Sequence, residues 1–99
     1  MQATKFDVES PVFTNSDTKV VVTVENRAGD YAFPLYLFAG KSGSKKLYYA
    51  AGSAIERGGS EDVTFYFAPT SAGTWNLYVT TDKEGKNVIG ETTTGQARQ

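Results

Sequence analysis

The segment TKVVVTVEN alternates apolar and polar side chains along most of its length. Successive side chains of a β-strand point to opposite faces, so a period of two predicts a strand with one buried face. Val20, Val22 and Val24 are therefore expected to face a core. Lys19, Thr23 and Glu25 are expected on the opposite face. No window of about 11 or more residues shows the 3.6-residue period of an amphipathic helix, so we expect a chain almost without helix.

Short apolar runs recur along the chain between clusters of glycine, serine, asparagine and aspartate, which are turn residues. Seven strands are expected, at about residues 5–8 with a resumption at 12–13, 18–26, 33–39, 47–51, 61–67, 74–80 and 87–92. Ile55, between two of these strands, is expected to enter the core. Gly85, in the turn TDKEGKN, is expected to adopt a positive φ.

Seven short strands and a single tryptophan, Trp75, are typical of a two-sheet sandwich. We therefore predict an all-β fold: a seven-stranded antiparallel two-sheet sandwich, immunoglobulin-like or fibronectin type III-like. Trp75 shares the parity of Leu77 and Val79, which favours a core position over a sugar-stacking platform on the surface. One domain is expected over residues 1–94, followed by a disordered tail or end segment over residues 95–99.

The charged and reactive residues argue against several classes of function. Ten Lys and Arg against eleven Asp and Glu leave a formal charge of -1 without a basic patch, so nucleic acid is not expected as a partner. Histidine and cysteine are absent, which removes the commonest general base and the commonest transition-metal ligands. We therefore expect no catalytic residues, no metal site and no cofactor, and we do not expect an enzyme.

Carboxylates gather in two places where calcium binding or acid–base chemistry can be considered. They are Asp82, Glu84 and Glu91 in one place, and Glu61 with Asp62 in the other. Calcium needs several oxygens converging on one point, and neither group has the D-x-D-x-D-G spacing. A catalytic pair needs a cleft between its carboxylates, which nothing in the sequence marks. We interpret both groups as turn and surface residues.

Membrane insertion is not expected, because no apolar run approaches the ~20 residues that a spanning helix needs. The first residues, MQATKFDVES, lack the basic and apolar regions of a signal peptide. The chain is thus expected to be either cytosolic or a domain taken from a longer exported protein.

The stretch YAFPLYLFAG hardly alternates, because apolar residues occupy both faces of the expected strand. Phe33, Leu35 and Leu37 share the face that is expected to be inward. Tyr36 and Phe38 take the opposite face, and the pattern leaves open what covers them.

Two further aromatic residues, Tyr48 and Tyr78, have the outward parity on strands expected beside this one. The hypothetical interaction face therefore consists of Tyr36, Phe38, Tyr48 and Tyr78. Four partly exposed rings approach the area at which an apolar patch indicates binding. The alternative is that the rings form cross-strand pairs that only stabilise the sheet, and one β-bulge would exchange the two faces. If Phe38 is exposed, Phe38→Ser is expected to leave the stability nearly unchanged.

Four segments carry a recurring pattern: VVVTVENRAGD, PLYLFAG, GGSEDVTFYF and AGTWNLYVTTDKEGKNVIGE. A valine-rich strand ends near Asn and Gly, a later strand follows a Gly-Ser turn, and GT-aromatic-x-L-x-V leads into a turn and a closing strand. The pattern spans about Val20 to Glu91 and resembles bacterial CARDB-like and fibronectin type III-like immunoglobulin modules. The sequence departs from it between Asn26 and Gly29, which are one residue further apart.

The resemblance implies a module of a secreted or cell-surface bacterial protein, without shared catalytic residues. Our first hypothesis is a non-catalytic immunoglobulin-like module for adhesion, spacing or domain docking. A neighbouring domain of the same chain, or a protein partner, would contact its aromatic face. The second hypothesis is a carbohydrate-binding module accessory to a polysaccharide-processing enzyme, in which Tyr36, Tyr48 and Tyr78 stack on sugar rings.

Overall fold

β-Strands make up the regular structure of the computed structural model, which describes residues 1–32 and 34–99. The nine strands among these residues are β1 (Gln2–Val8), β2 (Val12–Phe13), β3 (Thr18–Glu25), β4 (Leu35–Gly40), β5 (Lys46–Ala51), β6 (Ser60–Phe67), β7 (Asn76–Thr80), β8 (Val88–Thr93) and β9 (Ala97–Arg98). No described residue lies in an α-helix, and this part of the chain therefore holds no helix able to cross a membrane. The prediction of an all-β fold is confirmed.

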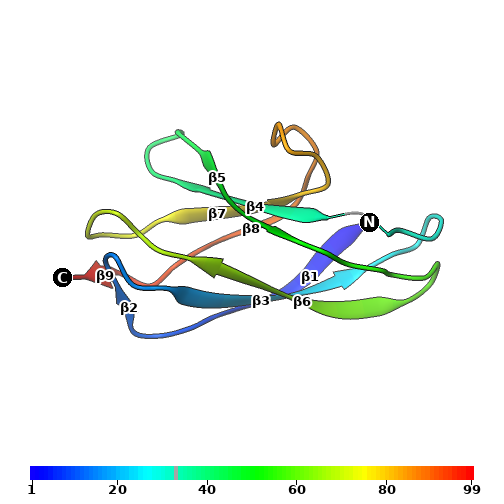
Figure 1. The fold of residues 1–99 in the computed structure, drawn as a ribbon, viewed down its shortest axis with the longest axis horizontal. Helices are drawn as coiled ribbons and strands as arrows, with labels where there is room; N and C mark the ends of the chain where they lie inside the picture. Colours follow the sequence, from blue (N-terminus) through cyan, green and yellow to red (C-terminus); the bar gives the residue numbers. More distant parts are fainter. Residues whose placement is uncertain (33) are drawn as a thin grey trace.

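Two antiparallel sheets lie one above the other (Figure 1). The three-stranded sheet has the order β1-β3-β6, and the four-stranded sheet has the order β5-β4-β7-β8. A short parallel pair, β2 with β9, lies at one end of the molecule. In this sandwich-like arrangement each sheet buries one face against the other, which is what the alternation of apolar and polar residues predicts.

The buried faces consist largely of residues with the expected inward parity. Val20, Val22 and Val24 of β3 have no exposed surface. In the three-stranded sheet, Val20 pairs with Phe65 and Val22 pairs with Val63. The other core residues expected from the sequence are also buried: Leu35, Leu37, Ile55, Phe67, Leu77 and Val79. Phe33, which was expected on the same face as Leu35 and Leu37, lies outside the described residues.

Trp75 is a core residue, as its parity predicts. It is only 6% exposed, and its ring packs edge-on against Phe67 with 5.3 Å between the ring centroids. The indole Nε1 donates a hydrogen bond of 3.0 Å to the carbonyl oxygen of Ser71. Lys41 lies over the ring, with its Nζ 5.1 Å from the ring centroid. Burial of the ring and a partner for its N–H are what a core tryptophan requires.

The expectation of a disordered tail is wrong for Ala97 and Arg98, which form β9. Ala97 is 2% exposed and exchanges two backbone hydrogen bonds with Gly73, of 2.8 and 3.1 Å. The carbonyl oxygen of Arg98 accepts a hydrogen bond of 2.7 Å from the N–H of Thr14. Because backbone groups make these contacts, the side-chain pattern of the last residues gives no sign of them.

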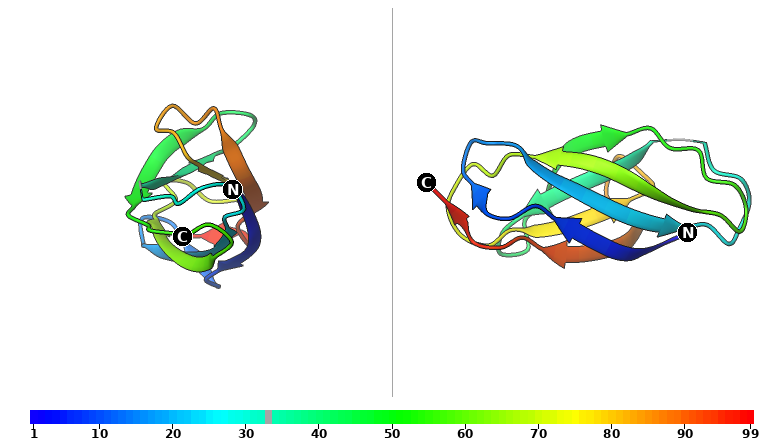
Figure 2. Two further views of the ribbon diagram at one scale, coloured as in Figure 1. Left: turned by 90° about the vertical axis from the view of Figure 1, so that its right-hand side faces the viewer. Right: turned by 90° about the horizontal axis from the view of Figure 1, so that it is seen from below.

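The molecule is elongated, with extents of 42 × 24 × 18 Å along its principal axes. The amino terminus lies toward one end of the long axis, and the carboxyl terminus lies at the other end (Figures 1 and 2). The chain therefore enters the sandwich near one end of its long axis and leaves it at the other.

The two lateral sides of the sandwich are closed differently. On one side β1 lies against β8, where a Cβ atom added to Gly90 would be only 2.5 Å from the Cβ of Ala3. Glycine at this position lets the edges of the two sheets approach closely. On the other side β5 and β6 meet through Tyr49, whose ring centroid is 5.8 Å from that of Tyr66.

Candidate functional site

Three of the four predicted aromatic residues occupy the face of the four-stranded sheet that points away from the three-stranded sheet, which we call the outer face. Tyr36 and Phe38 lie on β4, and Tyr78 lies on β7. Phe38 and Tyr78 are directly opposite each other in the antiparallel register. Tyr36 and Tyr78 are half-buried. The sequence thus predicts the side of the sheet correctly for these three residues.

Tyr48 does not belong to the outer face, and its assignment there is corrected. The register of β4 and β5 shifts: Leu37 pairs with Tyr49, but Phe38 pairs with Leu47. Tyr48 is the extra residue of this bulge, and its ring packs edge-on against Phe67 with 4.8 Å between centroids. A bulge re-aims the side chains of its strand. Leu47 therefore takes the outward position in β5 and is 39% exposed.

Phe38 is on the outer face but is covered, which answers what lies over this side of β4. The turn between β7 and β8 folds back over the ring, and a Cβ atom on Gly85 would lie 3.0 Å from two ring carbons. Gly85 has a φ of 75°, as the turn sequence predicts. Phe38 is only 6% exposed, so of the two alternatives that the sequence left open, the one with an exposed Phe38 is wrong. The cover comes from the β7–β8 hairpin, whose strand β7 pairs with β4.

Lys45 connects the two loops that rise above the outer face (Figure 1). Its Nζ donates a hydrogen bond of 2.6 Å to the carbonyl oxygen of Gly85. The same Nζ lies 5.8 Å from the ring centroid of Phe38 and 5.2 Å from that of Tyr78. These separations are within the range of cation–π attraction. Sequence reasoning missed this role, because a lysine in a glycine- and serine-rich loop usually only faces solvent.

Asp82 fixes the turn that covers Phe38. Its carboxylate accepts a hydrogen bond of 2.8 Å from the backbone N–H of Asn87 and one of 3.0 Å from that of Lys86. These two bonds favour the charged form and lower the pKa of the Asp82 carboxyl below its ordinary value. The interpretation of Asp82 as a turn residue agrees with this geometry.

We expect Asp82 to make the stability of the hairpin depend on pH under acid conditions. A pKa that is lower in the folded state stabilises the fold above the unfolded-chain value of roughly 4. That contribution is lost as the pH falls from there through the lower pKa of the folded protein. The measurement is an NMR titration of the Asp82 carboxyl carbon with the amides of Lys86 and Asn87. In Asp82→Asn the fall in stability over this range should be shallower, and an unchanged fall would contradict the assignment.

An open hollow of about 400 Å³ adjoins Tyr78 on the outer face. Its other lining residues are Asn76, Glu91, Thr92 and Thr93. Tyr78 pairs with Glu91 and Asn76 pairs with Thr93 across β7 and β8. The hollow therefore places amide, carboxylate and hydroxyl groups beside an aromatic ring. The sequence could have predicted that Asn76 lies on the same face as Tyr78, because the two residues are two positions apart on one strand. It could not have predicted that Glu91 lies opposite Tyr78, because the β7–β8 pairing has a register shift next to Val79 that the sequence does not show.

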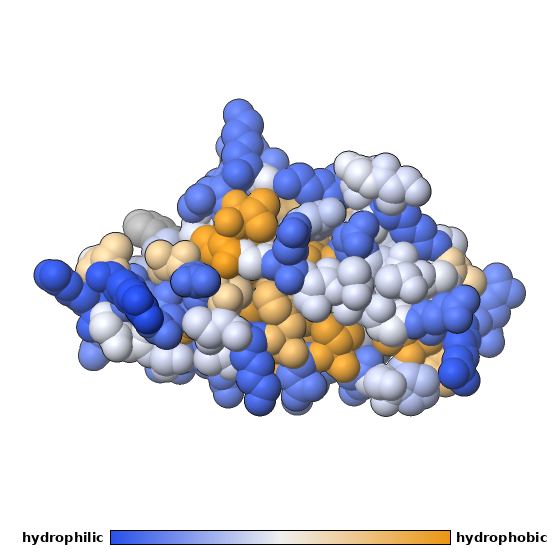
Figure 3. All heavy atoms as spheres, turned by 180° about the vertical axis from the view of Figure 1, so that it is seen from behind, coloured by the Kyte–Doolittle hydropathy of each residue, from blue (hydrophilic) through white to orange (hydrophobic). Residues whose placement is uncertain are grey.

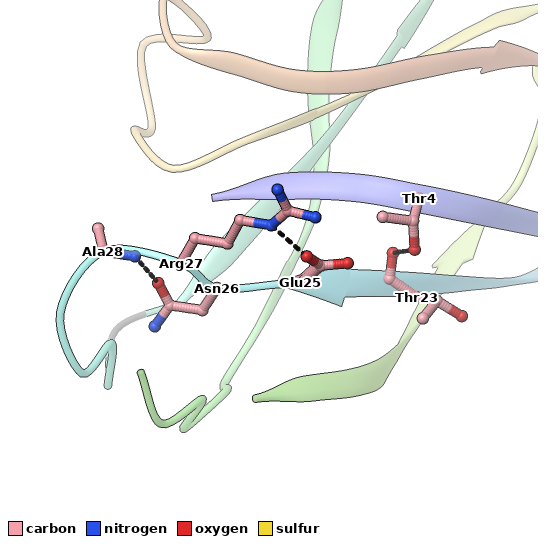
Figure 4. Close-up of polar contacts among 6 residues, drawn as sticks. All are labelled: Thr4, Thr23, Glu25, Asn26, Arg27 and Ala28. Atoms are coloured by element: carbon pink, nitrogen blue, oxygen red, sulfur yellow. Dashed lines mark hydrogen bonds and ion pairs between the residues drawn. The ribbon is translucent and has the colours of Figure 1, made fainter. Parts of the chain in front are cut away.

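A second polar cluster lies at the end of β3, around the buried side chain of Asn26 (Figure 4). Its Nδ2 donates to the carbonyl oxygens of Gly29 and Ile55, over 2.6 and 2.9 Å, and its Oδ1 accepts from the N–H of Ala28 over 3.2 Å. Arg27 and Glu25 form an exposed ion pair beside it. Asn26 thus ties two loops together, which gives it a structural role rather than a binding role.

The most exposed large apolar side chains of the described residues are spread over several strands. Four such side chains in residues 1–32 and 34–99 are more than a third exposed, and they lie on four different strands: Phe13, Leu47, Tyr66 and Val88. On the face seen in Figure 3, hydrophobic atoms form a band that hydrophilic side chains interrupt. Among the described residues, three or more carboxylates do not come together in a way that could hold a metal ion.

Comparison with known proteins adds no family to this geometry. A scan against protein-family models finds no match for the chain, and a comparison with curated proteins finds none either. The fold, the outer face and the hollow beside Tyr78 are the features that bear on function.

Proposed function

We propose that this chain is a non-catalytic immunoglobulin-like module, fibronectin type III-like in its strand order, that acts as a spacer and docking unit. The sequence resemblance places such modules in bacterial secreted or cell-surface proteins, and we propose the same setting here. The observation that carries the proposal is the elongated sandwich with its termini at opposite ends. Modules of this shape can be joined in series, each adding its length to the whole.

Two structural features support the finer assignment. The sheet orders β1-β3-β6 and β5-β4-β7-β8 are the three-plus-four division of a seven-stranded sandwich. The outer face presents Tyr36, Leu47 and Tyr78 around the covered Phe38. We propose that Tyr36, Leu47 and Tyr78, without Tyr48, form the surface that contacts a neighbouring module or a protein partner.

The spacer role is tested by small-angle X-ray scattering from two copies of the chain joined end to end by a short linker. The tandem is expected to have a maximum dimension of about twice the 42 Å long axis of one module. A single copy measured under the same conditions is the control. A tandem nearly as short as the single copy would mean that two modules fold back on each other, and the spacer role would fail.

Carbohydrate binding is the second candidate, and the hollow beside Tyr78 is the observation that favours it. Sugar rings need an apolar face to stack on and nearby groups for their hydroxyls, and Tyr78 with Asn76 and Glu91 offers both. Its volume of about 400 Å³ is within the range of small-molecule sites. Tyr48 is withdrawn from the stacking set because its ring faces the core.

The measurement is an NMR titration of the protein with a panel of soluble oligosaccharides. Binding should shift the amides of Asn76, Tyr78 and Glu91, and Tyr78→Ala should abolish the shifts. Tyr66→Ala, an exposed tyrosine of the other sheet, is the matched control and should bind as the wild type does. No shifts with any member of the panel would remove this candidate.

A further inference from the structure

A groove of about 470 Å³ lies between β5 and β6, on the lateral side of the sandwich opposite to the β1–β8 contact. It is lined by residues 49–54 on one side and residues 61–64 on the other, and we call it the β5–β6 groove. Tyr49 and Tyr66 are in edge-on contact where the two strands meet. Beyond Tyr49, the lining on the β5 side consists of alanine, glycine and serine.

Both strands that border this groove are edge strands. β6 pairs with β3, and β5 pairs with β4, while no other strand of the described residues pairs with their remaining edges. A free edge presents unpaired backbone N–H and C=O groups, which can pair with an added extended chain. The groove is therefore suited to a peptide in the extended conformation.

The edge of β6 is the more regular of the two. β6 pairs with β3 without a register shift from Ser60 to Phe67, whereas the pairing of β5 with β4 is interrupted by the bulge at Tyr48. The four groove residues of β6, 61–64, span roughly 13 Å at about 3.3 Å per residue. An added strand of about four residues would match this length.

The charges of the groove are both negative, and they belong to Glu61 and Asp62. Asp62 is engaged, because it accepts a hydrogen bond of 2.7 Å from the hydroxyl of Thr23. Glu61 pairs with Val24, a core residue, so its side chain has the inward parity and points between the sheets. Glu61 is exposed, and its side chain makes no hydrogen bond or ion pair within the described part of the chain. Its carboxylate is therefore available to a cation in the groove.

We propose that the β5–β6 groove binds an extended basic peptide segment of a partner protein, which pairs with the free edge of β6 and sets a Lys or Arg side chain against Glu61. Backbone pairing supplies the attachment, and the two carboxylates favour basic over acidic segments. This surface is separate from the outer face and from the hollow beside Tyr78. The proposal can therefore fail while the proposed function stands, and the reverse also holds.

The test uses two synthetic pentapeptides with blocked ends, one alternating valine with lysine and the other alternating valine with glutamate. Binding of each to the whole chain is followed by NMR shifts and amide hydrogen exchange. The lysine peptide should shift the amides of residues 50–54 and 61–64, and should slow exchange of amides on the free edge of β6. A lysine peptide with N-methylated backbone should lose this protection, because it cannot donate the backbone hydrogen bonds.

Charge variants give the sharper comparison. Glu61→Lys should reverse the preference: the lysine peptide should bind about threefold to tenfold more weakly, and the glutamate peptide should bind more tightly. The binding of both peptides to Glu61→Gln should be intermediate between that of the wild type and that of Glu61→Lys. Asp17→Lys, an exposed change outside the groove, is the matched control and should keep the wild-type preference. The preference should also weaken as salt is added.

Two results would overturn the proposal. The first is a failure of the NMR test. Either millimolar lysine peptide does not shift the amides of residues 61–64, or both peptides shift them equally and Glu61→Lys leaves these shifts unchanged. The second is sedimentation showing that copies of the chain associate, with the same β6 amides protected in the free protein. That result would assign the groove to a second copy of this chain instead of a basic peptide.

Discussion

Replacing Phe38 with alanine is expected to lower the free energy of unfolding by about 3 kcal/mol, the scale of truncating a buried phenylalanine. The ring is 6% exposed and lies under the turn at Gly85, so its removal leaves a space that this turn can only partly fill. Phe38→Ser should cost at least as much, contrary to what an exposed ring implies. Urea unfolding followed by the fluorescence of Trp75 measures the change.

Tyr36→Ala is the matched control for Phe38, because Tyr36 lies on the same strand and face but is half-buried. Tyr36→Ala should lower the free energy of unfolding by about 1 kcal/mol, the scale of a cross-strand pair. A double-mutant cycle of Phe38→Ala with Lys45→Met should show a coupling of about 0.5–1 kcal/mol, because the ammonium lies over the ring. If Phe38→Ala costs no more than Tyr36→Ala, the covered position of the ring is wrong.

Asn26→Ala is expected to destabilise the protein by about 2–3 kcal/mol, although Asn26 touches no part of the outer face. The change removes three hydrogen bonds, to Gly29, Ile55 and Ala28, each worth about 1 kcal/mol. The two loops that Asn26 connects should loosen together. Hydrogen exchange of the Tyr31 and Ile55 amides, which bond to each other's carbonyl oxygens, reports this loosening.

Two further variants separate the hydrogen bonds of Asn26 from its volume. Asn26→Asp keeps the shape but replaces the donor with an oxygen facing the carbonyls of Gly29 and Ile55, so it should destabilise more than Asn26→Ala at neutral pH. Asn87→Ala removes an exposed asparagine that bonds to Thr81 and should cost less than 1 kcal/mol. Equal losses for Asn26→Ala and Asn87→Ala would contradict the role of Asn26.

Sequence reasoning predicts well where one parity rule suffices. Most of the strands, the buried valines of β3 and the inward position of Trp75 follow from alternation, because a sheet with one buried face fixes every second residue. β9 does not follow from it, and β4 hardly alternates. The positive φ of Gly85 follows from local turn chemistry in the same way.

The candidate site was only partly predictable, because its other determinants are not local. Tyr48 turned inward through a one-residue bulge, which shifts parity without any mark in the residues themselves. Phe38 is covered by a turn more than forty residues further along the chain, and Lys45 reaches that turn from a different loop. Chain folding alone decides which distant groups meet.

The sequence by itself determines an all-β chain with its buried faces, since hydrophobic periodicity acts within each strand. It also determines that histidine and cysteine chemistry is absent. The tertiary structure decides which aromatic residues remain at the surface. Tyr36 and Tyr78 stay partly exposed on the outer face, and Phe38 is covered there by the turn at Gly85. Tyr48 is also half-buried, but its ring is turned toward Phe67. It also leaves β6 with a free edge beside Glu61, because pairing between strands is a property of the whole sheet.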